Sequence, residues 1–276
     1  MDLSRVKTIL ICFFLCLNLF LGYKLWFNPQ SLRQASMLSR EEIIQAENML
    51  AENGFELATT IPKQIPQLAL LHVSRPQENI SSWIKKFFPD NKVEMKQEGD
   101  KLVARRENEY LEITENGRVR YRNETSLEIA ELSWSQAEKL LKNWELLASD
   151  IKMDLARTTE EGTYFRYVQT YQGFPLFFTT VEIFFAESGA VEVLIDRATP
   201  QGFGDRLVTV ISALTALETF VEEAAFTDKK IVDISLGYYS GTYNASRLET
   251  APVWRIAAAG GETFYINAFT GEVEHK

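Results

Sequence analysis

The residues that could do chemistry are few in this chain of 276 residues. It has two histidines, His72 and His275, and two cysteines, Cys12 and Cys16. Zinc sites draw on clustered histidine, thiolate and carboxylate ligands, and these four residues are scattered or confined to the first 28 positions. The sequence has no nucleophile elbow, phosphate-binding loop or His-Glu-x-x-His motif. It therefore predicts a protein that is not an enzyme, with no catalytic, metal-ligating or cofactor-binding residue.

Paired carboxylates leave one enzymatic alternative open. Glu160-Glu161 and Glu222-Glu223 are typical of solvated surfaces. Two carboxylates act on a glycoside only at a defined separation in space, which sequence does not provide. A cell-wall enzyme therefore stays an alternative, and it requires an activity that one carboxylate substitution abolishes.

The N-terminal region predicts a membrane anchor. Residues 9–27 are almost entirely apolar, and about 20 such residues span a bilayer core of roughly 30 Å. Arg5 and Lys7 precede them, and basic flanks stay in the cytoplasm. Neither a small-residue cleavage site nor a lipoprotein-type cysteine follows, which disfavours a cleaved signal peptide. We expect a single-pass cell-membrane protein with residues 1–8 in the cytoplasm, a tether at 28–38, and the remaining chain extracytoplasmic.

One face of the expected anchor helix carries an unusual pair of residues. Asn18 is the polar side chain in the middle of the apolar stretch, and Gly22 lies four residues further on the same face. An intramembrane asparagine can bond to a neighbouring helix, and glycine allows a close approach. Helical spacing adds Ile11 and Phe14 to this face. We therefore expect a helix contact at these four residues; the alternative is that Asn18 bonds to its own backbone.

Composition limits the partners of the outer part. The chain has 29 basic and 38 acidic residues, and three of the basic and one of the acidic residues precede position 28. The rest therefore carries a formal charge of −11, which argues against nucleic acid and against lying flat on anionic lipid. Hydrophobic residues make up 46% of the chain, as expected for a folded core. No cysteine lies beyond position 16, so the outer part has no disulfide.

Local patterns predict helices and strands in alternation. Helices are expected to begin at four places: Ser39 (a capping box with Glu42), Pro76, Ser133 (a box with Gln136) and Asp205. Antiparallel strands are expected at 101–106, 109–114, 118–122, 164–171, 176–185, 190–196, 231–240, 253–259, 263–268 and 272–275.

A short turn element recurs among these strands. Gly-x-Val follows a turn at Gly117, Gly189 and Gly271. Helices followed by antiparallel strands also recur, which predicts an α+β fold whose helices pack on one face of each sheet. The polar segment Asn123–Glu131 is the expected domain boundary, and it divides the outer chain into two expected α+β domains, residues 39–125 and 130–276.

Several segments resemble one protein family over essentially the whole chain. The stretches are residues 1–11, 17–21, 171–177, 254–256 and 265–273. In combination with the single anchor and the chain length, they resemble the YycI (WalI) membrane regulatory proteins of Gram-positive bacteria, which accompany YycH and the WalK sensor histidine kinase. The Gln-x-x-x-Gly-x-Pro and Thr-Gly-Glu-Val stretches also resemble PepSY-type modules, so the resemblance implies PepSY-like or YycH-like units.

This resemblance implies a non-enzymatic regulator. The chain would form a heterodimer with a YycH-like membrane protein and modulate a WalK-type histidine kinase that controls cell-wall metabolism. The family supplies no catalytic residues, in agreement with the search above. A PepSY-like extracytoplasmic inhibitor or chaperone of a secreted protease is the alternative, and it would work without the native anchor. The aromatic segment 174–178 is a candidate contact surface, although burial in the core is the expectation we favour.

Overall fold

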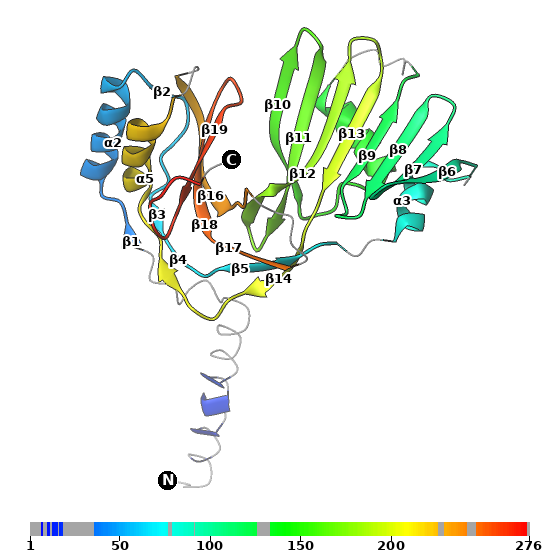
Figure 1. Cartoon of the computed structure of the whole chain (residues 1–276). Helices are drawn as coiled ribbons and strands as arrows, with labels where there is room; N and C mark the ends of the chain where they lie inside the picture. Colours follow the sequence, from blue (N-terminus) through cyan, green and yellow to red (C-terminus); the bar gives the residue numbers. More distant parts are fainter. Residues whose placement is uncertain are drawn as a thin grey trace.

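The computed structural model describes residues 7, 10, 11, 13–15, 17, 18, 36–76, 79–90, 92–125, 133–225, 229–241 and 247–274. Within these residues, no helix combines the length and apolar character needed to cross a bilayer. The body that begins at Ser36 is an α+β structure dominated by strands (Figure 1). This agrees with the α+β class expected from the sequence.

Four helices of the body have clear local causes. Ser39 and Glu42 form the expected capping box of α2, and Ser133 and Gln136 form that of α4. Asn79 accepts from the Ser81 N–H at the start of α3, and Ser212 accepts from the Thr215 N–H at the start of α5. The helices are α2 (Arg40–Glu52), α3 (Ile80–Phe87), α4 (Trp134–Asn143) and α5 (Ala213–Glu223).

The strands range from two-residue pairs to a 13-residue strand. They are β1 (Ser36–Met37), β2 (Glu56–Leu57), β3 (Gln64–Ile65), β4 (Gln67–Leu68), β5 (Leu71–Ser74), β6 (Glu94–Glu98), β7 (Lys101–Arg106), β8 (Glu109–Thr114), β9 (Val119–Asn123), β10 (Ile151–Thr159), β11 (Gly162–Tyr171), β12 (Phe174–Ala186), β13 (Val191–Asp196), β14 (Thr199–Phe203), β15 (Val208–Thr209), β16 (Lys230–Tyr238), β17 (Arg247–Thr250), β18 (Pro252–Ala258) and β19 (Thr263–Asn267).

One large sheet organises the described part of the chain. Its 12 strands include the run β19-β18-β16-β12-β13-β9-β8-β7-β6, with β10 and β11 added beside β12 and β2 beside β16. The pairing is antiparallel except where β12 meets β16, through Leu176 and Tyr238, and where β2 meets β16. The long strand β12 is therefore the link between the two halves of the sheet.

Each half of the sheet has its own helices and its own core, and we call these halves lobes. In the first lobe, α2 and α5 cover β16, β18 and β19, and the buried side chains include Leu50, Phe220 and Trp254. In the second lobe, α3 and α4 cover β7–β9 and β11–β13, with Phe87 and Leu141 in the core. Figure 1 shows α2 and α5 at one side of the molecule and α3 at the other, with the strands of the large sheet between them.

Several predicted boundaries match closely and one helix was placed wrongly. The strands at 101–106 and 109–114 have the predicted bounds, and Gly117, Gly189 and Gly271 occupy their turns with φ near +80°. The helix expected from Asp205 is wrong, because α5 begins at Ala213 and Val208–Thr209 form β15. The helix expected from Pro76 begins later, at Ile80.

The division of the outer chain into domains 39–125 and 130–276 stays a prediction. The large sheet itself continues across this position, since β9 pairs with β13. The aromatic segment 174–178 lies in β12 with Phe177 and Phe178 buried, as favoured from the sequence.

Candidate functional site

The feature most able to carry function is the helix-free face of the large sheet, which we call the inner face. Alternation along each strand builds it. On β11 and β12, Phe165, Val181 and Ile183 turn toward the helices of the second lobe, and neighbours such as Arg166 and Glu182 turn to the opposite side. The inner face therefore carries these charged side chains, and no helix of the described chain covers it.

Arg255 joins the two lobes on this face. It lies on β18 of the first lobe, and its guanidinium donates to Asp154 of β10 in the second lobe with Nη1–Oδ1 at 2.5 Å. It also donates to Asp233 of β16, with Nη2–Oδ2 at 3.0 Å. Asp154 accepts in turn from Arg166, with Nη2–Oδ2 at 2.7 Å. Two carboxylates and two guanidinium groups thus form one connected network across the junction.

The centre of this network is removed from solvent. The side chain of Arg255 is 9% exposed and that of Asp154 is 4% exposed. Burial by itself lowers the pKa of Arg255, but the carboxylates of Asp154 and Asp233 outweigh it and hold that pKa above the ordinary value. Arg255 therefore stays charged, and removing Asp154 would leave its buried guanidinium with Asp233 alone as a carboxylate partner.

Aromatic rings complete the junction around Arg255. Its guanidinium carbon lies 4.3 Å from the centre of the Phe177 ring, within cation–π range. Phe177 also contacts Tyr265, whose ring stacks on that of Tyr239 with centroids 3.9 Å apart. A Cβ at Gly237 would lie 2.6 Å from the Phe177 ring, so only glycine leaves room for it there.

Further from the junction, the inner face of the second lobe carries a ladder of ion pairs. Arg118, directly before β9, bonds to Asp196 of β13 at 2.6 Å, and Arg120 of β9 bonds to Glu192 of β13 at 2.7 Å. Burial raises the pKa of Asp196, although the hydrogen bond from Arg118 opposes the shift. A shallow hollow of about 420 Å³ opens here, with the exposed Leu194 among these charges. A broad, mixed-charge sheet face of this kind suits a protein surface better than a small ligand.

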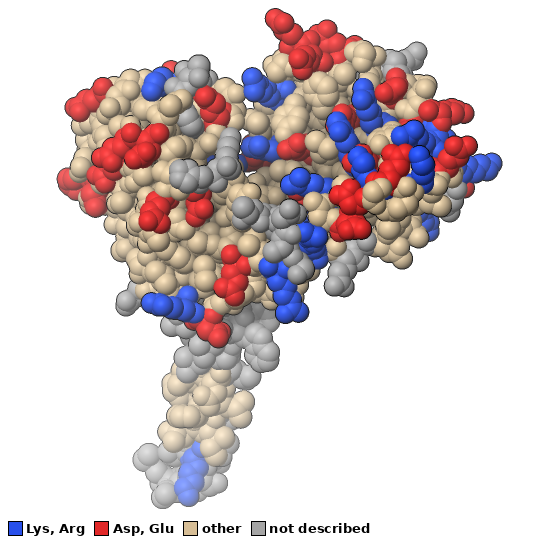
Figure 2. Space-filling model, in the orientation of Figure 1, with Lys and Arg blue, Asp and Glu red and all other residues tan. Residues whose placement is uncertain are grey.

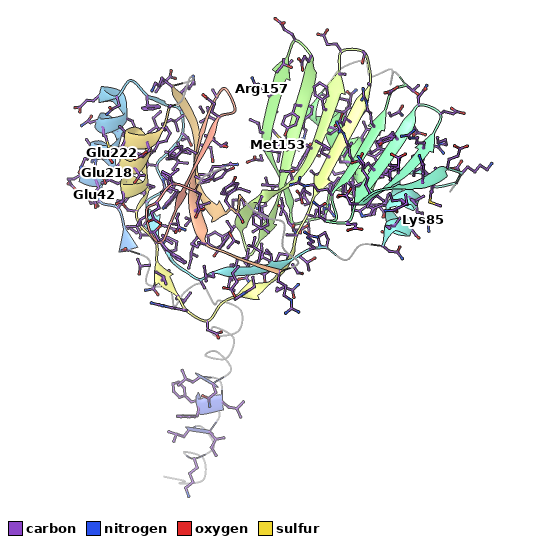
Figure 3. All side chains as sticks on the ribbon, in the orientation of Figure 1. Glu42, Lys85, Met153, Arg157, Glu218 and Glu222 are labelled. Carbon is purple, nitrogen blue, oxygen red and sulfur yellow. The ribbon has the colours of Figure 1, made fainter. Side chains whose placement is uncertain are left out.

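The two lobes differ in charge on the face of the molecule that Figure 2 draws. Figure 2 shows acidic side chains spread over the first lobe, whereas basic and acidic groups alternate on the second. Figure 3 places Glu42, Glu218 and Glu222 on α2 and α5, and Met153 and Arg157 at the edge of β10 that faces β19. The Nη1 atom of Arg157 would lie 3.5 Å from a Cβ at Gly261, in the turn before β19, so the lobes also approach each other above the junction.

Buried phenols predict how the fold responds to alkali. Burial raises the pKa of five of the ten tyrosines, that of Tyr167 to about 12; the others are Tyr121, Tyr164, Tyr239 and Tyr265. Above pH 10 the folded state therefore holds more protons than the unfolded state, and stability falls as pH rises through this range.

We expect the ultraviolet absorbance of the folded protein near pH 11 to lack the phenolate signal of these five tyrosines. In urea, where the protein is unfolded, the same tyrosines should ionise with an ordinary pKa. Equal phenolate signals from the folded and unfolded protein at that pH would contradict the prediction.

The residues predicted from sequence lie elsewhere. Ile11, Phe14 and Asn18 are helical and exposed, and Gly22 lies outside the described residues. The proposed helix contact is therefore untested. His72 pairs with Glu249 at 3.2 Å in a surface hollow, and His275 lies outside the described residues.

Sequence reasoning missed the junction. Arg255 stands in an otherwise apolar run from Val253 to Ala258, and a lone charge in a buried strand is a signal that could have flagged it. Its partner Asp154 lies 101 positions away, and nothing local indicates the pairing.

The chain is similar to one protein family and to several solved structures. The family model described as YycI protein matches residues 33–269. Among solved structures, YycH from Bacillus subtilis is similar with a TM-score of 0.50 and 11% identity, over 74% of this chain and 54% of that one. The Bacillus megaterium YpeB C-terminal domain is similar with a TM-score of 0.41 and 16% identity, over 87% of this chain and 96% of that one. An uncharacterized protein from Eubacterium rectale has a TM-score of 0.48 and 12% identity, over 83% and 98%. No curated protein sequence matches significantly.

Proposed function

The chain belongs to the YycI family, and we propose that it is a non-enzymatic, membrane-anchored regulator that works with a YycH-like partner on a WalK-type sensor histidine kinase. Family membership supports a regulatory role in the WalK/WalR system. The likeness to YycH concerns the fold alone. The observation that carries the proposal is the family match over residues 33–269.

The anchor is part of this proposal. Residues 9–27 would hold the chain in the cell membrane with the body outside, and the face formed by Ile11, Phe14, Asn18 and Gly22 would contact a neighbouring helix. A sensor kinase alternates between two states, and a regulator changes its output only by binding one state more tightly. We assign the contact between the body and its partner proteins to the inner face, because this face is broad, carries ion pairs and is not covered by a helix of the described chain.

Co-purification from native membranes tests the proposal. The full-length protein is compared with a form whose residues 9–27 are replaced by an unrelated membrane helix. We expect a second single-span protein and a histidine kinase to accompany the native form and to weaken with the replacement. A secreted protease or wall glycan bound to both forms, with no kinase bound to either, would overturn the regulator and favour the inhibitor or the enzyme.

Asn18→Leu tests the anchor contact more finely. We expect it to reduce recovery of the partner and to shift the phosphorylation of the response regulator. Cys16→Leu is the matched control, because position 16 lies about 200° around the helix from position 18. If Asn18→Leu leaves both the recovery of the partner and the phosphorylation of the response regulator unchanged, Asn18 is not part of the contact.

A further inference from the structure

One end of the body carries exposed apolar side chains beside basic ones. Met37, Leu70 and Leu207 are 62%, 38% and 47% exposed. Lys63 and Arg206 are exposed as well. We call these five residues the basal patch. Large apolar side chains exposed together, with cations beside them, are typical of surfaces that contact a partner or a membrane.

Backbone contacts show that the basal patch is continuous. The N–H of Leu38 donates to the carbonyl of Lys63 at 2.8 Å, which sets Met37 beside Lys63. Leu68 pairs with Val208, and the N–H of Gly204 donates to the carbonyl of Leu70 at 2.9 Å. The segments that contain Leu70 and Leu207 therefore run side by side. Figure 1 shows β1, β4 and the connection between β14 and β15 along one end of the body.

The chain length before Ser36 restricts how far this end can lie from a membrane. The inference rests on the proposed function, in which the anchor ends at position 27. Nine Cα–Cα steps then reach Ser36, or at most about 30 Å when fully extended. This is less than the diameter of a folded unit of this size, whose radius of gyration is about 18 Å. The first body element, β1, contains Met37, so the basal patch is the end held next to the bilayer.

Acidic side chains occur at both ends of the body. In the basal loop Asp205 lies beside Arg206, and Glu249 of β17 pairs with His72 of β5. At the opposite end of the body, the turns after β10 and β12 carry the exposed Glu160, Glu161 and Glu187. Anionic headgroups attract basic groups and repel acidic ones. The net charge of the outer part opposes lying flat on such lipid, but it does not oppose contact through this end.

We propose that the basal patch rests on the anionic bilayer surface, with Met37, Leu70 and Leu207 at the depth of the headgroups and Lys63 and Arg206 on lipid phosphates. The contact orients the body so that its inner face stands upright beside the membrane. A partner anchored in the same membrane would meet that face at a fixed height.

Spin labels on the full-length protein test this orientation. The background variant replaces Cys12 and Cys16 with alanine, and single labels are placed at Leu207→Cys, Met37→Cys and, as the control at the far end, Glu160→Cys. The protein is reconstituted in vesicles of phosphatidylglycerol and phosphatidylethanolamine. We expect the ratio of oxygen to nickel-chelate accessibility at 207 and 37 to exceed that at 160 by about threefold or more, because oxygen partitions into lipid and the chelate does not.

The headgroup charge supplies a second readout. With Lys63→Gln and Arg206→Gln combined, or in phosphatidylcholine vesicles, we expect the ratio at 207 to fall toward the control value. Carbonate extraction is run on the same vesicles. Protein that resists extraction but shows equal ratios at 207, 37 and 160 would overturn the basal contact alone. Protein that carbonate removes would overturn the anchor, and with it both proposals.

Discussion

Replacing Arg255 with alanine is expected to lower the free energy of unfolding by about 3 kcal/mol, at the lower end of the cost of breaking a buried ion pair, because the buried carboxylate of Asp154 loses one of its two cations. Asp154 is 4% exposed and keeps only Arg166 as a charged partner, while Asp233 loses its bonds to the guanidinium. Urea unfolding of the full-length protein in detergent, followed by fluorescence, measures the change.

Arg118→Ala is the matched control for Arg255→Ala. The Arg118–Asp196 pair is also short, at 2.6 Å, but the Arg118 side chain is 62% exposed. Exposed ion pairs contribute only about 0–1 kcal/mol. If both variants lower the free energy of unfolding by the same amount, the Arg255 network contributes no more to stability than an exposed ion pair does.

A double-mutant cycle separates the pair from its surroundings. Arg255→Met with Asp154→Asn removes both charges, so the cost should fall below the sum of the two single changes, by a coupling of about 0.5–3 kcal/mol. Strictly additive losses would mean that Arg255 acts through Phe177 or Asp233 instead.

The junction also bears on regulation. If the lobes are held in one relative orientation by Arg255, the variant should loosen them while leaving each core intact, since the two cores contain separate helices. Hydrogen exchange should then rise first at β10 and β18, before the strands under α3 and α5.

Sequence predicted the elements whose causes are local. Ser39 and Ser133 begin helices because each reaches the backbone three residues ahead and receives a side chain back. The strand pair at 101–106 and 109–114 closes through a turn of two residues, so its register depends on neighbours in sequence.

The misplaced helix shows where local reasoning ends. Residues 207–217 have apolar spacing compatible with a helix, and Asp205 can serve as a cap. In the fold, Val208 pairs with Leu68, and the N–H groups of Val210 and Ile211 donate to Pro66 and Ala268. These distant partners hold the segment extended until Ser212 caps α5. Tertiary pairing decided between two locally acceptable conformations.

The junction could not be predicted from the sequence for a similar reason. A sequence reader can see that Arg255 is a charge among apolar residues, but not that β10, about one hundred positions earlier, returns to meet it. The sheet linkage through β12 creates that proximity, since β12 meets β16 in parallel at Leu176 and Tyr238.

Gly237→Ala is expected to destabilise the protein by about 3 kcal/mol, at the upper end of overpacking costs. The added Cβ would lie 2.5 Å from the carbonyl oxygen of Pro175 and 2.6 Å from the Phe177 ring. A side chain can turn aside, but the Pro175 oxygen belongs to the backbone of β12, so β12 and β16 must separate where they pair. Displacing Phe177 also removes the ring beneath Arg255.

Gly99→Ala separates this clash from the general effect of replacing glycine. Nothing lies within 4 Å of a Cβ at Gly99, so the change costs only its φ of +65°, about 1–2 kcal/mol. Adding Phe177→Leu to Gly237→Ala should recover part of the loss, because it relieves the ring contact and leaves the contact with Pro175. Equal costs at positions 237 and 99, with no recovery, would mean that β12 and β16 are not closely packed at Gly237, and the junction would then depend on Arg255 alone.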